Sequence, residues 1–501
     1  MARVVPMTEP VEPFGRSDAD RAAPQVATTA ARNAAVLSAA EILGKVASLG
    51  LALVAARRLD HASFGFYSFG LALALLLAVI PSWGFDQLLV QRASSGADDL
   101  DSLVAHTLAW RLLLGGGVLA TTALVMGITS TDSDHAAILI ILVAATCMDT
   151  LTDTGKSAAA VVHRQAGVAV SLVVQRATTA ALAIVALVVL DDALVWVAGS
   201  YLVGSVIGLV STAYVVHRLD VRLRRPATKR AELRDTGRRS LLVGLEVVVA
   251  MVLFRVDMPI LQLVRGSNEV AIYAVAYRVA ETTLFLSWTI CAVALPRFAA
   301  RRSDPIAQRT TFESSIAAAA AFYVPFACVA FVVPERVLRL LFGPSYSSPA
   351  ATSLRWLALT PLVFAIWLIG GYVLVAHERF WTSLIITVVC AFLNIAGNFI
   401  LLPRFGSAGA AATTTVTFAF GAAAVISAGR ADMGIPRLGR TLAVAIVAGG
   451  AMTVALILTA ALPIVVGVAI AVVVDACVWW VIARRFAPSQ IEAITGLVAR
   501  S

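Results

Sequence analysis

Residues 240–264 read SLLVGLEVVVAMVLFRVDMPILQLV, an apolar stretch in which only Glu246, Arg255 and Asp257 carry charge. A helix crosses the hydrocarbon core of a bilayer in roughly 20 apolar residues, so this stretch predicts a membrane-spanning helix. On insertion scales a charged side chain at the centre of such a helix costs about 2.5–3.5 kcal/mol when it faces lipid. The stretch therefore predicts a membrane protein whose charged groups face the protein interior.

The rest of the chain repeats this pattern. Of its 501 residues, 59% are hydrophobic and 14% charged, and the mean hydropathy is +0.87. This composition lies far from that of soluble domains, and the runs are solidly apolar, unlike the alternating strands of membrane β-barrels. We predict an all-α polytopic membrane protein with about fourteen spans of roughly 20 residues each. The expected spans are 34–56, 64–82, 103–128, 136–153, 167–190, 193–217, 240–264, 270–295, 311–333, 351–375, 380–402, 407–428, 440–461 and 463–484.

Positive charge is distributed unevenly among the loops. Cytoplasmic loops retain Lys and Arg, and with the N-terminus inside, the inner loops hold most of the 39 Lys and Arg. The outer loops hold only Arg57, Arg58, Arg265, Arg336, Arg339 and Arg404. We therefore expect a plasma-membrane protein with both termini in the cytoplasm. The loops also account for the net charge of +9 without a nucleic-acid partner.

A basic stretch divides the chain into two halves. The expected parts are a disordered cytoplasmic tail over 1–33, a six-helix bundle over 34–217, a basic cytoplasmic linker over 218–239, a second six-helix bundle over 240–428, two extra helices within 440–484, and a cytoplasmic tail over 485–501. A faint repeat, SFGFYS at 63–68 and EVAIYA at 269–274, opens the second helix of each half in the same direction. Parallel repeats of this kind occur in transporters. The linker either anchors the topology or binds anionic lipid.

Charged residues of both signs fall within the expected spans. They are Lys45, Arg111, Arg176, Arg255, Arg278 and Arg355, with Glu41, Asp149, Glu246, Asp257, Glu281 and Asp475. They must face one another or a water-filled cavity. The spacings of Glu41 with Lys45 and of Arg278 with Glu281 suit pairing on one helix face. Arg255 and Asp257 are two residues apart, so at least one of them needs a partner on another element.

Five of these cations are candidates for binding an anionic substrate. They are Lys45, Arg111, Arg176, Arg255 and Arg278. Arginine offers a two-pronged fork to phosphate oxygens and stays protonated, so a ladder of cations suits a diphosphate. The acids Glu41, Asp149, Asp257 and Glu281 either pair with the cations or couple transport to H⁺ or Na⁺. Structural ion pairing is the alternative for every one of these residues.

Some polar and aromatic residues have two interpretations. Asp149 and Asp153 share a helix face and either form a cation site or include an ion pair with Lys156. Tyr273, Tyr277 and Trp288 recur near the Glu281 face and either pack or form a sugar platform. For Asp475 we expect a hydrogen bond to a Ser or Thr on a neighbouring helix.

The sequence carries no catalytic motif. The six histidines occur singly, and there is no HExxH motif, nucleophile elbow or Walker A loop. The five cysteines lie in apolar stretches without paired spacing. We therefore expect no catalytic residues, no metal site and no cofactor, and neither an ATP-driven pump nor a metalloprotease.

Several short stretches follow one another in a fixed order. They are GFYS at 65–68, GFDQLLVQR at 84–92, RVD at 255–257, IYAVAYR at 272–278, LLFGPSY at 340–346, the run from Asn394 through Asn398, PRFG at 403–406 and GAA at 409–411. Together they resemble the polysaccharide-flippase (Wzx-like) branch of the MOP exporter superfamily. The resemblance covers roughly residues 34–430.

The resemblance implies a MATE/MurJ-like fold of two six-helix bundles around a central cavity. It implies alternating access without ATP, and a polyprenyl-diphosphate-linked oligosaccharide as the cargo that is flipped to the outer leaflet for cell-surface polysaccharide biosynthesis. The expected partners are the bilayer, this lipid-linked glycan and the polysaccharide polymerase machinery. In the related lipid II flippases, cavity arginines grip the diphosphate and two additional helices form a groove for the lipid tail, which the helices within 440–484 would provide here.

Two other functions remain open. A MATE-type multidrug or cation antiporter is expected to favour acidic cavity residues. A membrane glycan polymerase is expected to carry catalytic residues on a sizeable outer loop, and the longest expected outer loop here covers only 334–350.

Overall fold

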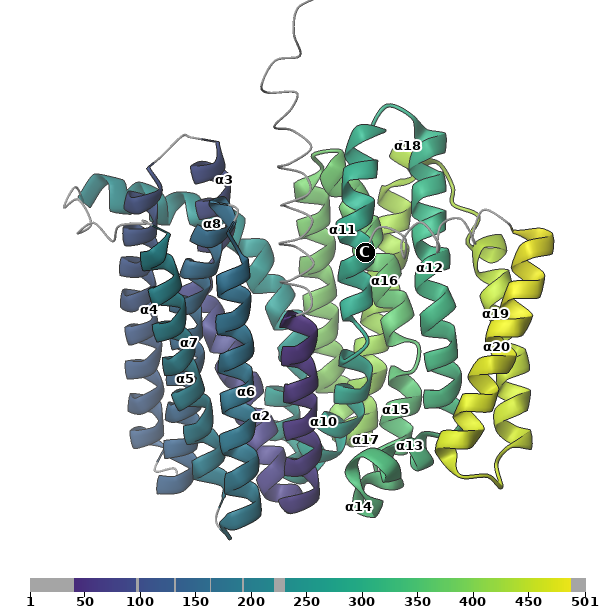
Figure 1. Ribbon diagram of the computed structural model, residues 1–501, viewed down its shortest axis with the longest axis horizontal. Helices are drawn as coiled ribbons and strands as arrows, with labels where there is room; N and C mark the ends of the chain where they lie inside the picture. Colours follow the sequence, from purple (N-terminus) through teal and green to yellow (C-terminus); the bar gives the residue numbers. More distant parts are fainter. Residues whose placement is uncertain are drawn as a thin grey trace, which may run out of the picture.

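The computed structural model describes residues 40–95, 99–129, 132–162, 164–191, 193–219 and 230–487. Helices make up the regular structure of these ranges, and no strand occurs in them (Figure 1). The all-α prediction is therefore confirmed. The predicted tail over 1–33 lies outside the described residues, as do residues 220–229 of the predicted linker and 488–501 of the predicted C-terminal tail.

The N-terminal half consists of a helix over 40–58 followed by α2 (His61–Ser82), α3 (Phe85–Ser94), α4 (Leu100–Ile128), α5 (Ser133–Val161), α6 (Ala166–Val189) and α7 (Leu194–Arg218). Helix α5 is central to this half because it packs against α2, α3, α4 and α7. Two helix starts have an aspartate cap. Asp60 Oδ2 accepts the Ala62 amide at 3.0 Å, and Asp99 Oδ2 accepts the Ser102 amide at 3.2 Å.

The C-terminal half follows with α8 (Arg230–Arg255), α9 (Asp257–Arg265), α10 (Ser267–Glu281), α11 (Phe285–Ala300), α12 (Pro305–Val332), α13 (Pro334–Phe342), α14 (Pro344–Ser347), α15 (Ala351–Leu357), α16 (Thr360–Ala376), α17 (Phe380–Ala428), α18 (Arg430–Met433), α19 (Leu438–Leu458) and α20 (Ile464–Phe486). The halves lie side by side, and α19 and α20 lie at the outer edge of the second half, next to α12 (Figure 1). Helix α8 begins at Arg230, so part of the predicted linker is helical.

Helix α17 is folded back on itself. Gly406 interrupts its 49 residues with φ 54° and ψ −135°. The Cys390 thiol donates to the Thr417 carbonyl at 3.8 Å, although 27 residues separate them. A straight helix would place these residues about 40 Å apart. The two arms are therefore antiparallel, as the predicted spans 380–402 and 407–428 require.

The described residues contain fewer helices that are long and apolar enough to cross a membrane than the fourteen spans predicted from the sequence. Among the described helices, eleven are long and apolar enough to cross a membrane, or twelve when the bent pair Gly244–Arg255 and Asp257–Arg265 is included. The whole of Phe380–Ala428 counts once in this number, and the charged helix over 40–58 is not in it. A multi-pass membrane protein is therefore established, whereas the number of fourteen spans stays a prediction.

Two predicted spans are broken next to charged residues. Helices α8 and α9 meet at a bend of 41° around Val256. Pro259 explains this bend, because it has no N–H to donate to the Arg255 carbonyl four residues earlier. The span predicted over 270–295 is broken between α10 and α11. There the hydroxyls of Thr282 and Thr283 bond to carbonyls one turn back, at 2.6 and 2.7 Å, and compete with the helix ladder.

The two halves touch closely between α2 and α10. A Cβ atom on Gly65 would overlap the carbonyl oxygen of Ser267, so only glycine permits this approach. Nearby, Arg57 Nε donates to the Leu341 carbonyl at 2.9 Å. The His61 ring stacks on Tyr346 with centroids 4.3 Å apart. These contacts join the halves at the end of the molecule that the charge pattern predicts to face outward.

We expect Gly65→Ala to destabilise the protein by about 1–3 kcal/mol, because the added methyl group meets backbone rather than a movable side chain. The thermal unfolding midpoint of the purified, detergent-solubilised protein measures this effect. Gly116→Ala in α4 is the matched control, because a Cβ atom there meets no other atom within 4 Å. Equal midpoints for the two variants would show that the α2–α10 contact does not limit stability.

Candidate functional site

A cavity of about 440 Å³ lies between the two halves of the protein. Its walls come from the helix over 40–58, α2, α5, α6 and α7 on one side and from α8 to α11 on the other. Four of the five predicted cations line it: Lys45, Arg176, Arg255 and Arg278. Residues from four separate segments thus come together in one cavity.

Three of the predicted acids line the same cavity. They are Glu41, Asp149 and Glu281. With four cations and three acids, the lining carries one excess positive charge when all groups are ionised. The cavity is therefore weakly cationic rather than strongly so.

Glu281 holds two of the arginines. Its Oε1 lies 2.7 Å from Arg255 Nη2, and its Oε2 lies 3.3 Å from Arg278 Nη1. The predicted pair of Arg278 with Glu281 is present, and Arg255 has the partner on another element that its spacing from Asp257 required. The side chains of all three are 21–29% exposed, so they face the cavity.

Lys45 does not form its predicted pair. Among the ion pairs of the described residues, none joins it to Glu41. Its Nζ lies instead 5.8 Å from the centroid of the Phe285 ring, within the range of a cation–π contact. Phe285 begins α11, directly after the break, so Lys45 contacts the C-terminal half across the cavity.

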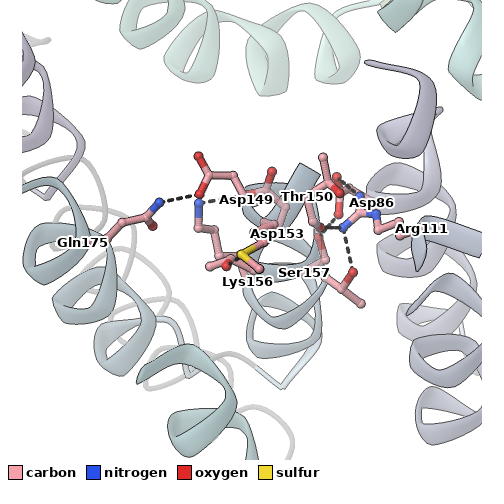
Figure 2. Close-up of polar contacts among 11 residues, drawn as sticks. Asp86, Arg111, Asp149, Thr150, Asp153, Lys156, Ser157 and Gln175 are labelled. Atoms are coloured by element: carbon pink, nitrogen blue, oxygen red, sulfur yellow. Dashed lines mark hydrogen bonds and ion pairs between the residues drawn. The ribbon is translucent and has the colours of Figure 1, made fainter. Parts of the chain in front are cut away.

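Asp149 and Arg176 also line a small polar annex of the cavity. The amide of Gln175 donates to Asp149 Oδ1 at 2.6 Å, from α6 to α5 (Figure 2). Ser205 and Tyr201 of α7 complete the lining. One turn along α5, Lys156 pairs with Asp153 at 2.8 Å, so the ion-pair interpretation of this aspartate is confirmed.

Arg111 lies away from the cavity, on the other face of α5 from Asp149 (Figure 2). Only 1% of it is exposed. It donates to Asp86 of α3 at 2.7 Å, to the Thr154 hydroxyl at 2.7 Å and to the Thr150 carbonyl. Loss of Asp86, whose side chain is 31% exposed, would leave this buried guanidinium without its counter-ion. Its position is that of a structural residue that ties α3, α4 and α5 together, and not that of a substrate-binding residue in the cavity.

Asp257 is likewise outside the cavity and only 2% exposed. Its carboxylate accepts hydrogen bonds from Tyr273 at 2.9 Å, Asn398 at 2.7 Å and Thr414 at 2.6 Å. All three donors are neutral. Asn398 also donates to Asn394, which is buried beside it. No role was predicted for the two asparagines, although two amides four residues apart in an apolar helix are a detectable signal.

Aromatic side chains form part of the cavity wall. Tyr277, Phe254 and Trp288 line it, and Tyr67 and Tyr201 share a hydrogen bond of 2.7 Å. Tyr273 does not belong to this wall, because its hydroxyl is buried on Asp257. The predicted stripe on the Glu281 face is therefore divided between cavity lining and packing.

Three further charged residues of the predicted spans lie outside the cavity. Glu246 accepts from the Ser383 hydroxyl at 3.4 Å, and Arg355 pairs with Glu335 at 2.7 Å. Asp475 is buried, and its Oδ1 has no hydrogen-bond partner, so the expected bond from a Ser or Thr does not reach this atom. Within the described ranges, no group of three or more His, Cys, Asp or Glu is placed to hold a metal ion.

Several solved structures of membrane transporters have folds similar to this one. A lipid II flippase MurJ in an inward closed conformation superposes with a TM-score of 0.76 and 11% identity, over 89% of this chain and 98% of that one. A multidrug resistance MATE family transporter of the MOP superfamily, in an inward-facing conformation, gives 0.63 and 16% over 78% and 94%. A MOP superfamily transporter from Pyrococcus furiosus, described as having a binding pocket of reversed polarity, gives 0.58 and 15% over 81% and 96%. At these identities the likeness shows the fold alone.

Two family models match the sequence itself. The model of the polysaccharide biosynthesis proteins matches residues 30–301, and that of the lipid II flippase MurJ matches residues 167–480. No curated protein matches the chain. Each model covers more than half of the 501 residues, so the chain belongs to the polysaccharide biosynthesis protein family and to the lipid II flippase MurJ family.

Proposed function

We propose that this protein flips a polyprenyl-diphosphate-linked oligosaccharide from the cytoplasmic to the outer leaflet of the plasma membrane, by alternating access, for cell-surface polysaccharide biosynthesis. Both termini lie in the cytoplasm, and the polymerase machinery receives the product. The observation that carries the proposal is the convergence of Lys45, Arg176, Arg255 and Arg278 on one cavity between the halves. A flippase of this kind binds and moves its cargo without chemical change, so it is not an enzyme.

The cations suit the diphosphate for an electrostatic reason. An anionic headgroup that crosses the hydrocarbon core needs a continuous set of opposite charges. Arginine supplies several donors in a fixed plane and remains protonated at every depth. Arg255 and Arg278 come from different helices, so a phosphate between them is held by both.

The cavity is large enough for only part of the proposed cargo. A volume of about 440 Å³ lies within the range of small-molecule sites, about 300–1,000 Å³. It accommodates the diphosphate and part of the glycan, whereas the polyprenyl chain stays in apolar surroundings. We propose that this chain runs along α19 and α20, although α20 carries the buried Asp475 among apolar residues.

A MATE-type multidrug or cation antiporter is the second candidate. Glu41, Asp149 and Glu281 in the cavity favour it, as does the MATE-like fold. A glycan polymerase has less support, because the segment expected as its outer loop consists of the short helices α13 and α14.

We propose that an ion couples to transport at Asp257. This carboxylate is buried and bonded only to neutral donors, and a buried charge without a counter-ion favours binding of H⁺ or Na⁺. Glu281 is less suited to this role, because it is held by two arginines. The membrane potential adds about 2.3 kcal/mol per charge per 100 mV to the outward movement of an anion.

Cells that lack this gene are expected to accumulate one diphosphate-linked glycolipid in unpolymerised form, because its transfer across the membrane stops. Mass spectrometry of extracted lipids, alongside the parent strain and a complemented strain, identifies the cargo. An unchanged lipid pool combined with increased sensitivity to cationic dyes would support the multidrug exporter instead.

Replacement of the cavity arginines is expected to reduce flipping without loss of the protein. Arg255→Gln and Arg278→Gln each remove charged hydrogen bonds to the substrate, and we expect about tenfold or greater losses of transport in complementation assays normalised to protein level. Arg355→Gln is the control, because it breaks an ion pair outside the cavity whose length of 2.7 Å equals that of the Arg255–Glu281 pair. Full transport by both cavity variants would rule out a cationic binding site.

Asp257→Asn is expected to preserve folding, because the amide retains the shape of the side chain and part of its hydrogen bonding, and to abolish the dependence of flipping on an ion gradient. The measurement is transport of the glycolipid in vesicles with imposed H⁺ or Na⁺ gradients. Asp153→Asn is the control, because this acid pairs with Lys156 on α5. An Asp257→Asn protein that responds to the gradients as the wild type does would exclude coupling at this residue.

A further inference from the structure

Glu281 binds the two arginines in an unusual way. Its two carboxylate oxygens serve different guanidinium groups, Oε1 for Arg255 at 2.7 Å and Oε2 for Arg278 at 3.3 Å. Lys45 lines the same cavity. Two cations from two helices therefore converge on a position that one small anion fills.

A phosphate group satisfies the same geometry. Carboxylates and phosphates both present oxygens that guanidinium groups bind in parallel, and Arg recognises both with one fork. The position of the Glu281 carboxylate is thus a preformed phosphate position. Any phosphate that enters between Arg255 and Arg278 must first displace Glu281.

We propose that Glu281 is a tethered competitor of the substrate: its carboxylate occupies the phosphate position in the empty cavity and admits only a ligand with more negative charge than one carboxylate. The inference rests on the proposed function, because it names Glu281 as the residue that sets the charge requirement for the lipid headgroup.

The surrounding lipid explains why a competitor is needed. A cavity that receives its cargo from a bilayer meets ordinary phospholipids, whose phosphodiesters each carry one negative charge. An open pair of arginines would bind these abundant headgroups. A resident carboxylate has the same single charge and is covalently attached, so it outcompetes a monoanionic phosphodiester. A diphosphate carries additional charge and gains contacts with both arginines and Lys45, so it displaces the carboxylate.

The local backbone allows Glu281 to leave. This residue ends α10, and the following residues 282–284 form the break before α11. The break is held by Tyr323, whose hydroxyl donates to the Thr283 carbonyl at 3.0 Å and accepts the Ser287 amide at 3.1 Å. Arg255 ends α8 at the 41° bend. Both partners of the ion pair therefore lie at helix ends, where small changes of backbone angle separate them.

The test measures anion binding by the purified full-length protein. The probes are inorganic pyrophosphate and dimethyl phosphate, a monoanionic phosphodiester, at constant ionic strength. We expect the wild type to bind pyrophosphate and to discriminate against dimethyl phosphate. Glu281→Ala vacates the phosphate position, so it is expected to bind pyrophosphate about tenfold more tightly and to bind dimethyl phosphate as well.

Two further variants make the result decisive. Glu335→Ala removes the partner of Arg355 at the same 2.7 Å distance outside the cavity and is expected to gain no anion binding. Glu281→Gln keeps the size of the side chain, and pyrophosphate is expected to raise its thermal unfolding midpoint more than that of the wild type. If Glu281→Ala does not fold, the unfolding midpoint of Glu281→Gln with pyrophosphate tests the inference instead.

Unchanged binding of both probes by the Glu281 variants would overturn the inference and leave the proposed flippase intact. If Glu335→Ala gains as much anion binding as Glu281→Ala, the inference is also overturned, because the loss of an acid anywhere in the protein would then have the same effect. Failure of the flippase proposal has a different signature. It is a normal glycolipid pool in cells without the gene.

Discussion

The cost of a bare charge in hydrocarbon is the constraint on which the structure depends. Each charged group in a span must find a partner or face the cavity. Arg111 finds Asp86, Arg255 finds Glu281, and Asp257 is surrounded by three neutral donors. These requirements determine which face each helix turns inward. Small residues such as Gly65 then let the helices approach closely enough for the partners to meet.

Breaks in two helices position the charged groups of the cavity. Along a helix, Arg255 and Asp257 point to nearly opposite sides at almost the same depth in the membrane. Arg255 accordingly lines the cavity, whereas Asp257 lies in a polar cluster behind it, and the bend at Val256 falls between them. The break after Glu281 likewise brings Phe285 over Lys45. Interrupted helices are a common device in transporters, because irregular backbone is tolerated where it borders a cavity.

The sequence predicted the helical class, the two-part arrangement and four of the cavity cations, because intramembrane charge is a strong signal. It did not predict the position of Arg111. Depth along a helix follows from residue number, but the direction of a side chain depends on neighbouring helices. The partner of Arg111, Asp86, belongs to α3, which follows the predicted span 64–82. The asparagines beside Asp257 belong to a stretch that carries the family resemblance, but no role was predicted for them because they are uncharged. The pairing of Lys45 with Phe285 depends on the break before α11, which no proline marks.

The acids in the cavity do not by themselves indicate a cationic cargo. Four cations facing an empty cavity would repel one another and attract any anion within reach, so an anion-binding protein also needs acids when its site is empty. Glu281 supplies one charge to two arginines, whereas a cation-binding acid would be expected to face the cavity without such partners. The relation between the acids and the cations therefore carries more information than their number. At Glu281 the pairing of one carboxylate with two arginines favours an anionic substrate, which binds at the position that this carboxylate occupies.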